Sequence, residues 1–153
     1  MTKEAEFSFK SPNDSPGYLL THVTMLWQRK QKKALDPLDL THTQFVLLAS
    51  LSWLSKESNA VTQVDIANQS NADRMMVSKV LRTLEEKKLV TRQEHEKDTR
   101  AKTIQLTKTG REILQKAIIK VENVDKDFFE TIEANLSSFN ANMLKLIDEN
   151  KGE

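Results

Sequence analysis

The segment from Val61 to Thr107 constrains the fold most strongly, because it contains two closely spaced helix starts followed by two short alternating stretches. Thr62 can cap the free N–H groups of a first helix, and Asp65 can reach back to the same cap. Asp73 can cap a second helix after the short polar connection SNA. We therefore predict a short helix that begins at Thr62, a tight turn, and a longer helix that follows Asp73.

The second of these helices has two distinct faces. Its apolar residues recur at i, i+3, i+4 and i+7, which is typical of a buried stripe; they are Val77, Val80, Leu81 and Leu84. Short polar and cationic side chains on the opposite side can enter a major groove. They are Arg74, Met75, Ser78, Lys79 and Arg82, with Met76 beside them at the start of the helix. The alternative is an amphipathic surface helix with an ordinary solvated face.

Two alternating stretches follow, Leu89–Glu94 and Lys102–Leu106, and they predict a β-hairpin with Ile104 and Leu106 on its inner face. The polar segment HEKDTRA between them lacks the Asn-Gly or Asp-Gly of a two-residue turn, so we expect a longer loop. Helix, turn, helix and hairpin in this order predict a winged helix-turn-helix, a mainly α-helical fold with a small β-hairpin wing.

From residue 40 to residue 114 the chain resembles the multiple-antibiotic-resistance regulator (MarR) family. The matching segments are LTHTQFVLLASL, QVDIANQSNADRMMVSKVLRTLEEKKLVTR and DTRAKTIQLTKTG. The resemblance implies a transcriptional regulator whose partner is duplex DNA. It also implies that Arg100 at the wing tip reaches into a minor groove and that Asp98 orients the wing loop. The alternative for Arg100 is a solvated charge at the hairpin tip.

Three sites depart from the usual pattern of that family. Met75 and Met76 stand where relatives often carry Ser or Thr, which removes hydroxyl groups, although Met can still contact a thymine methyl. Asn71 stands in the turn where Gly is common, and Asn tolerates the left-handed conformation. Lys88 also replaces a common Gly, and we expect little cost if its φ is not positive.

Charge is distributed unevenly along the chain, although the net charge is only +1. Residues 73–111 contain 11 Lys and Arg against 6 Asp and Glu, whereas residues 112–153 contain 5 against 9. The basic section coincides with the predicted DNA-binding helix and wing, although an ordinary solvated charge run is the alternative. The chain has no Cys, which excludes disulfides and sensing through a thiol.

Long apolar stripes flank the predicted winged helix. One runs through Leu19, Val23, Leu26 and Trp27; the later ones comprise Ile113, Leu114, Ala117, Ile118, Val121, Val124 and Phe128, then Ile132, Leu136, Phe139, Met143 and Ile147. Such helices can close a monomeric bundle, but the resemblance implies that they intertwine in a homodimer, which would read a pseudo-palindromic site. We predict one domain over residues 1–153, with a DNA-binding lobe at about 40–110 and dimerisation helices at about 15–35 and 110–150.

Another helix begins at a predicted capping box formed by Thr41 and Gln44, and it is apolar nearly all round from Phe45 to Leu54, which predicts burial. The resemblance implies that a small-molecule effector binds near this helix, at the junction with the dimerisation helices. By this analogy the candidate lining residues are His22, Trp27, Phe45 and Trp53. The alternative for the aromatic residues is plain core packing.

Enzymatic motifs are missing, since the chain has no phosphate-binding glycine loop, no His-Glu-x-x-His and no nucleophile elbow. We predict a DNA-binding transcriptional regulator with no catalytic activity and no cofactor, and we favour a repressor over an activator. Two alternatives are a winged-helix module that binds protein, and a metal-responsive regulator that uses His22, His42 and His95 with carboxylates. No apolar segment is long enough to span a membrane and no secretion signal is present, so we expect a cytoplasmic protein.

Overall fold

The structure is a computed structural model that describes residues 2–94, 97 and 102–152. Its main elements in chain order are α1 (Pro16–Leu35), α2 (His42–Ser55), α3 (Gln63–Ser70), α4 (Arg74–Glu86), β1 (Val90–Glu94), β2 (Lys102–Leu106), α5 (Lys108–Phe129) and α6 (Leu136–Glu149). Short 3-10 turns, η1 to η3, lie at Pro12–Asp14, Asp36–Leu38 and Glu130–Asn135. The prediction of a mainly helical winged helix-turn-helix is confirmed.

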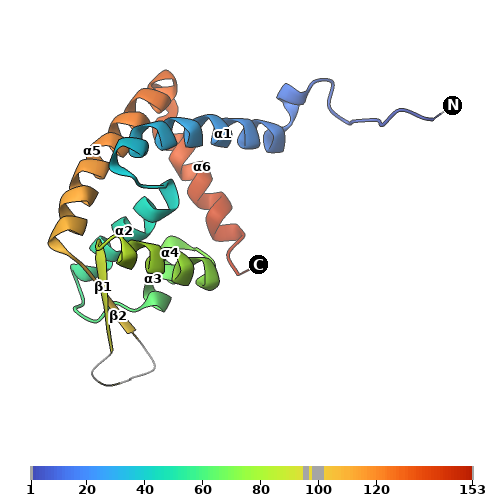
Figure 1. Cartoon of the computed structure of the whole chain (residues 1–153). Coiled ribbons are helices and arrows are strands. Elements are labelled where there is room, and N and C mark those ends of the chain that lie inside the picture. Colours follow the sequence, from blue (N-terminus) through green and yellow to red (C-terminus); the bar gives the residue numbers. More distant parts are fainter. Residues whose placement is uncertain (1, 95–96, 98–101, 153) are drawn as a thin grey trace.

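Two parts of the molecule are visible in Figure 1. Helices α2, α3 and α4 and the β1–β2 hairpin form a lobe, from which the hairpin projects at one end. Helices α1 and α5 pack together on the opposite side of α2, and α6 runs back toward the lobe. The segment before α1 extends away from the rest of the chain.

The predicted helix starts are present with their caps. The side chain of Thr62 accepts a hydrogen bond from Asp65 N at 3.2 Å, and the Asp65 carboxylate accepts one from Thr62 N at 2.9 Å. The Asp73 carboxylate accepts from Met76 N at 3.0 Å. Thr41 and Gln44 form the capping box of α2. Local sequence therefore sets where each helix of the lobe begins.

The inner stripe of α4 forms the centre of the lobe. Val77, Leu81 and Leu84 are buried, and Val80 is half-buried against the same core. The residues that pack around them come from every element of the lobe and from α5, including Leu48, Leu51, Ile66, Ile104 and Leu114. Because this stripe is fixed in the core, the opposite face of α4 must point outward.

The wing is an antiparallel pair in which Val90 lies opposite Leu106 and Glu94 lies opposite Lys102. Leu89, which we expected in the first strand, immediately precedes it and is buried. The backbone N–H of Ile104 also donates to Val61 O at 2.8 Å, so the chain before α3 attaches to the second strand of the wing. Most of the predicted wing loop lies outside the described residues.

The turn after α4 does not meet the condition under which we expected little cost at Lys88. Asn71 adopts the predicted left-handed conformation with φ of 52°, but Lys88 also has a positive φ, 63°, so its replacement of Gly does carry a conformational cost. The turn is held by Leu89 N, which donates to Leu84 O at 3.0 Å. Just beyond the wing, Gly110 is required by close packing, because an added Cβ would lie 2.0 Å from Leu89 O.

Two helices depart from the predicted pattern. Trp53, which we expected to be buried with the rest of α2, is 64% exposed. The C-terminal stripe is interrupted, because Ile132 has non-helical φ and ψ inside η3, and the last helix begins only at Leu136. None of the residues of α6 is buried. Within the described part of the chain, no helix is long and apolar enough to cross a membrane.

Candidate nucleic-acid interface

The outer face of α4 presents the predicted DNA-binding side chains. Arg74, Lys79 and Arg82 are exposed, and Met75 is 83% exposed, so none of these four side chains supports the core. Met76 and Ser78 are half-buried at the edges of this face. A helix with one buried stripe and a cationic outer face has the shape and charge to enter a major groove and contact phosphates on both sides.

Arg92 in β1 ties the wing to this helix, a role that our sequence analysis missed. Its Nη2 donates to the backbone oxygen of Ser78 at 3.1 Å, and its Nε lies 4.0 Å from a carboxylate oxygen of Glu85. Arg92 lies opposite the buried Ile104 across the hairpin, so its side chain shares the inner face. The sequence signal for this role was an arginine at a position of the alternating strand where the side chain points inward.

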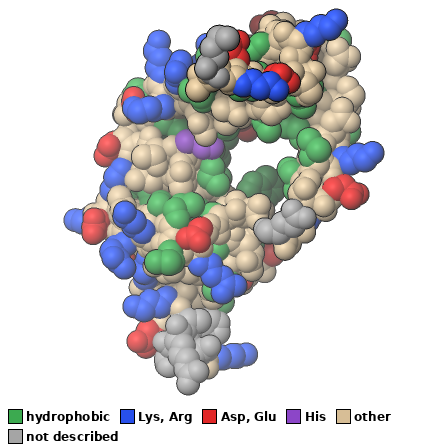
Figure 2. Space-filling model, turned by 90° about the vertical axis from the view of Figure 1, so that its right-hand side faces the viewer, with side chains coloured by type: hydrophobic (Ala, Val, Ile, Leu, Met, Phe, Trp, Pro, Cys, Tyr) green, Lys and Arg blue, Asp and Glu red, His purple; other side chains and the backbone are tan. Residues whose placement is uncertain are grey.

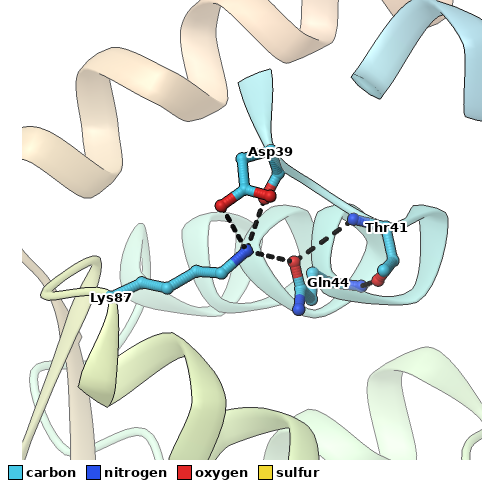
Figure 3. A network of polar contacts seen from close by, with 4 residues as sticks. All are labelled: Asp39, Thr41, Gln44 and Lys87. Carbon is cyan, nitrogen blue, oxygen red and sulfur yellow. Dashed lines mark hydrogen bonds and ion pairs between the residues drawn. The ribbon is translucent and has the colours of Figure 1, made fainter. Parts of the chain in front are cut away.

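Lys87, the residue at which α4 ends, contacts the connection between α1 and α2. Figure 3 shows its side chain extending to Asp39 and Gln44, and the Gln44 side chain in turn bonding the backbone of Thr41. Lys87 and Arg92 thus restrain α4, the predicted recognition helix, from two sides: Lys87 contacts the start of α2, and Arg92 belongs to the wing. Neither was among the predicted site residues.

The predicted wing-tip residues Asp98 and Arg100 lie outside the described residues. The hairpin that carries them projects from the lobe (Figure 1), and Lys97 and Lys102 are exposed on it. In Figure 2, Lys and Arg side chains gather over the lobe on the side toward the wing. The exposed cations Arg74, Lys79 and Arg82 of α4 and Lys102 of the wing all belong to the basic section of the sequence.

The predicted effector residues do not form one group. Phe45 and Trp53 line a cavity of about 240 Å³ between α2 and α5, together with Ala49, Ser52, Lys56, Ile118 and Glu122. The Nζ of Lys56 lies 4.0 Å from the centre of the Trp53 ring. Trp27 and His22 are not part of this lining, and His22 is exposed on α1, where its ring contacts Tyr18.

Trp27 belongs to a polar cluster that joins α1, α2 and α5. Its Nε1 donates to Asp125 Oδ1 at 2.8 Å, and Gln31 Nε2 donates to the same oxygen at 3.0 Å. The Trp27 ring meets His42 edge-on with 4.9 Å between centroids, and His42 lies 6.3 Å from the Phe45 ring. Burial lowers the pKa of His42 below its usual value of 6.5, and the carboxylate of Asp125 opposes this shift.

Metal ligation gains no support from this geometry. His22 and His42 lie on different helices, and His95 lies outside the described residues. Among residues 2–94, 97 and 102–152, no three His, Asp or Glu side chains are grouped so that they could hold a metal ion.

Comparison with known proteins places this arrangement in a family. Residues 36–125 match the family described as the ArnR1-like, winged-helix domain. An uncharacterized HTH-type transcriptional regulator, YdcH of Bacillus subtilis (strain 168), is 45% identical over 121 residues, which cover 79% of this chain and 82% of that protein. A solved MarR-family regulator from Rhodococcus sp. RHA1 has the same fold, with a TM-score of 0.76 and 24% identity over 91% of this chain and 96% of its own. The chain belongs to the ArnR1-like winged-helix family.

A second solved structure, the S. aureus MepR–DNA complex, has a TM-score of 0.80 and 26% identity, and the match covers 88% of this chain and 98% of that chain. Membership of this winged-helix family, together with the related HTH-type transcriptional regulator, confirms the prediction of a DNA-binding transcriptional regulator and the prediction that the protein is not an enzyme.

Proposed function

We propose that the protein is a dimeric repressor that binds a pseudo-palindromic operator, with one α4 helix in each half-site, and that a small molecule releases it. The observation that carries this proposal is the outer face of α4, which is exposed and cationic while its inner stripe is fixed in the core. Because the target of a transcriptional regulator is chromosomal DNA, we place the protein in the cytoplasm.

The DNA contacts follow from this docking. From α4 we assign contacts to Arg74, Met75, Met76, Ser78, Lys79 and Arg82, and from the wing to Asp98 and Arg100. In this arrangement α4 lies in the major groove, and the projecting wing reaches the neighbouring minor groove through Arg100. Ser78 is half-buried, so its hydroxyl is suited to a phosphate or a base edge close to the helix axis.

Exposed apolar side chains support the dimer. Leu20 on α1 is 66% exposed and Leu146 on α6 is 65% exposed, and similar residues surround them on both helices. Figure 2 shows hydrophobic side chains around an opening between α6 and the rest of the molecule. A second copy that inserts its own helices here would bury surface that is costly to leave in water.

For the effector we propose the cavity between α2 and α5 that Phe45 and Trp53 line, with Trp27 and His42 as the adjacent wall. His22 would contribute only through rearrangement or across the dimer. A ligand in this place contacts both the lobe and the α5 dimerisation helix. The two lobes can adopt a spacing that fits the operator and a spacing that does not. To release DNA, the ligand must have the higher affinity for the conformation with the spacing that does not fit.

Selection of bound fragments from random duplex DNA tests the proposal. We expect two inverted half-sites whose centres are about 34–36 Å apart or a multiple of that distance. The selected duplex is then titrated with wild-type protein, Arg100→Ala and the control Lys116→Ala, which alters an exposed cation on α5. Recovery of single half-sites, or of half-sites without a fixed spacing, would overturn binding as a dimer. Full affinity in Arg100→Ala would overturn the role of the wing in DNA binding.

A further inference from the structure

Lys87 has a basic side chain beside the DNA-binding helix, but its ammonium group is turned toward the connection between α1 and α2. Its Nζ donates to the backbone oxygen of Asp39 and, at 3.2 Å, to Gln44 Oε1, while Asp39 Oδ2 lies 3.4 Å away. All three acceptors surround the same nitrogen in Figure 3. An ammonium has three N–H donors, so these contacts account for its full capacity.

Contacts and backbone geometry that do not involve Lys87 help to position its acceptors. Gln44 is buried, and its Oε1 also accepts from Thr41 N at 3.2 Å as part of the capping box of α2. Asp39 has a φ of 53°, a left-handed conformation that turns its backbone oxygen and its carboxylate toward the same side (Figure 3). The Lys87 side chain is 27% exposed and the Asp39 side chain 94%, so the contact with the buried Gln44 is the part of the network that is shielded from water.

These contacts connect two parts of the molecule with different tasks. Lys87 is the C-terminal cap of α4, whereas Asp39 follows the 3-10 turn that ends α1. Apolar packing of α4 is non-directional and tolerates small rotations, but hydrogen bonds to a charged group restrain direction as well as distance. The network therefore restrains the C-terminal end of α4 relative to the start of α2 and the connection that joins it to α1.

We propose that Lys87 is a positioning residue that sets the distance between the two recognition helices, and thereby the half-site spacing that the protein accepts. This inference rests on the proposed dimeric binding to two half-sites. In the proposed dimer α1 contributes exposed apolar side chains to the interface, so a restraint between α4 and the connection that follows α1 limits the position of each α4. Without the ammonium, the C-terminal end of α4 can shift relative to that connection, and operators with altered spacing become acceptable.

The competing explanation is that Lys87 contacts a DNA phosphate directly. The two roles give different dependences on salt. Loss of one phosphate contact reduces the slope of log affinity against log salt by about 0.9. Loss of an internal positioning contact leaves this slope unchanged, because the number of counterions released on binding stays the same.

The test measures affinity of the full-length protein for the selected operator and for versions with one base pair inserted or removed between the half-sites, each at several salt concentrations. The variants are Lys87→Met, which keeps the length of the chain, Lys87→Arg, which keeps the charge, and the control Lys116→Met. We expect Lys87→Met to lose most of the wild-type preference for the correct spacing at an unchanged salt slope. Lys87→Arg should recover part of it, and the control should match wild type.

Equal spacing preference in Lys87→Met and wild type would overturn the inference, and so would a reduced salt slope. If wild type itself shows no spacing preference, the dimeric mode of binding is wrong instead. Should Lys87→Met be unfolded at the assay temperature, Asp39→Asn takes its place, because Asn keeps the left-handed turn and removes only the carboxylate charge. That variant should show a smaller loss of the same preference, and no loss would also overturn the inference.

Discussion

At the scale of single residues, three of the four positive-φ positions in the described part of the chain are occupied by residues other than glycine, and the fourth is Gly152 near the C-terminus. The chain has only three Gly, and in its described part Asp39, Asn71 and Lys88 have φ values of 53°, 52° and 63°. Asp and Asn tolerate this conformation through local hydrogen bonds, but Lys has no such compensation. Lys88 therefore carries strain that the turn after α4 imposes.

Lys88→Gly should relieve this strain and raise the free energy of unfolding by about 1 kcal/mol. Denaturant titration measures the change. Lys116→Gly is the matched control, because it places glycine in the interior of α5 and should lower the same free energy by about 1 kcal/mol. Destabilisation by both variants would show that the left-handed conformation of Lys88 is not costly.

His42 gives the protein a pH-dependent stability. Burial lowers its pKa in the folded state below the unfolded value of 6.5, so the unfolded state binds protons more readily. The contribution is therefore complete above pH 6.5 and is lost as the pH falls through the lower, folded pKa. His42→Phe keeps a ring against Trp27 and cannot titrate. Between pH 7 and pH 5 its melting temperature should fall less than that of wild type, and an equal fall would contradict this assignment.

At the scale of elements, α4 combines an apolar stripe that packs in the core with an outer face that is available to bind DNA. Lys87 and Arg92 restrain this helix at its C-terminal end and along its flank, so substitutions on the outer face should affect DNA rather than folding. Length and charge do not distinguish base readers from phosphate binders on that face. Arg can form a bidentate pair with guanine, whereas Lys acts as a point charge.

Arg82→Ala should relax the preference at one position of each half-site, with a loss of discrimination of about 1–3 kcal/mol. Lys79→Ala should weaken binding to all duplexes by a similar factor, as loss of a phosphate contact does. Both variants are titrated against a panel of single-base operator variants. A uniform loss in Arg82→Ala would assign it to phosphate instead, and no loss in either variant would mean that α4 does not face DNA.

At the scale of the whole molecule, many apolar side chains of α1 and α6 are exposed in the described part of the chain. No residue of α6 is buried, although its side chains include Met143, Leu144, Leu146 and Ile147. The break at Ile132 turns α6 away from the direction of α5, so its apolar face is presented for contact rather than folded into the core. This geometry suits an interface made by two copies.

Replacing both Leu144 and Ile147 with Glu should convert the dimer to monomer. These side chains are 60% and 53% exposed in the single chain, so the lobe should keep its fold. Sedimentation equilibrium gives the assembly state, and circular dichroism checks the helix content. Lys145→Glu on the same helix is the control for added negative charge. A dimer that persists in the double variant would mean that α6 lies outside the interface.

The order of elements was readable from the sequence because its signals are local. The caps at Thr41, Thr62 and Asp73 and the periodicity of Val77, Leu81 and Leu84 depend on residues a few positions apart, and the structure confirms all of them. The alternation of the two wing strands is equally local. These features settled the fold class and the side of α4 that faces outward.

Tertiary structure decided the features that depend on residues far apart in the chain. The contacts of Lys87 with Asp39 and Gln44 join positions separated by more than forty residues, and no periodicity signals such a pairing. Trp53 was expected to be buried because α2 is apolar nearly all round, yet one side of that helix stays open beside α5. Burial is a property of the packed molecule, since the neighbours that exclude water come from other elements, and local sequence does not specify them.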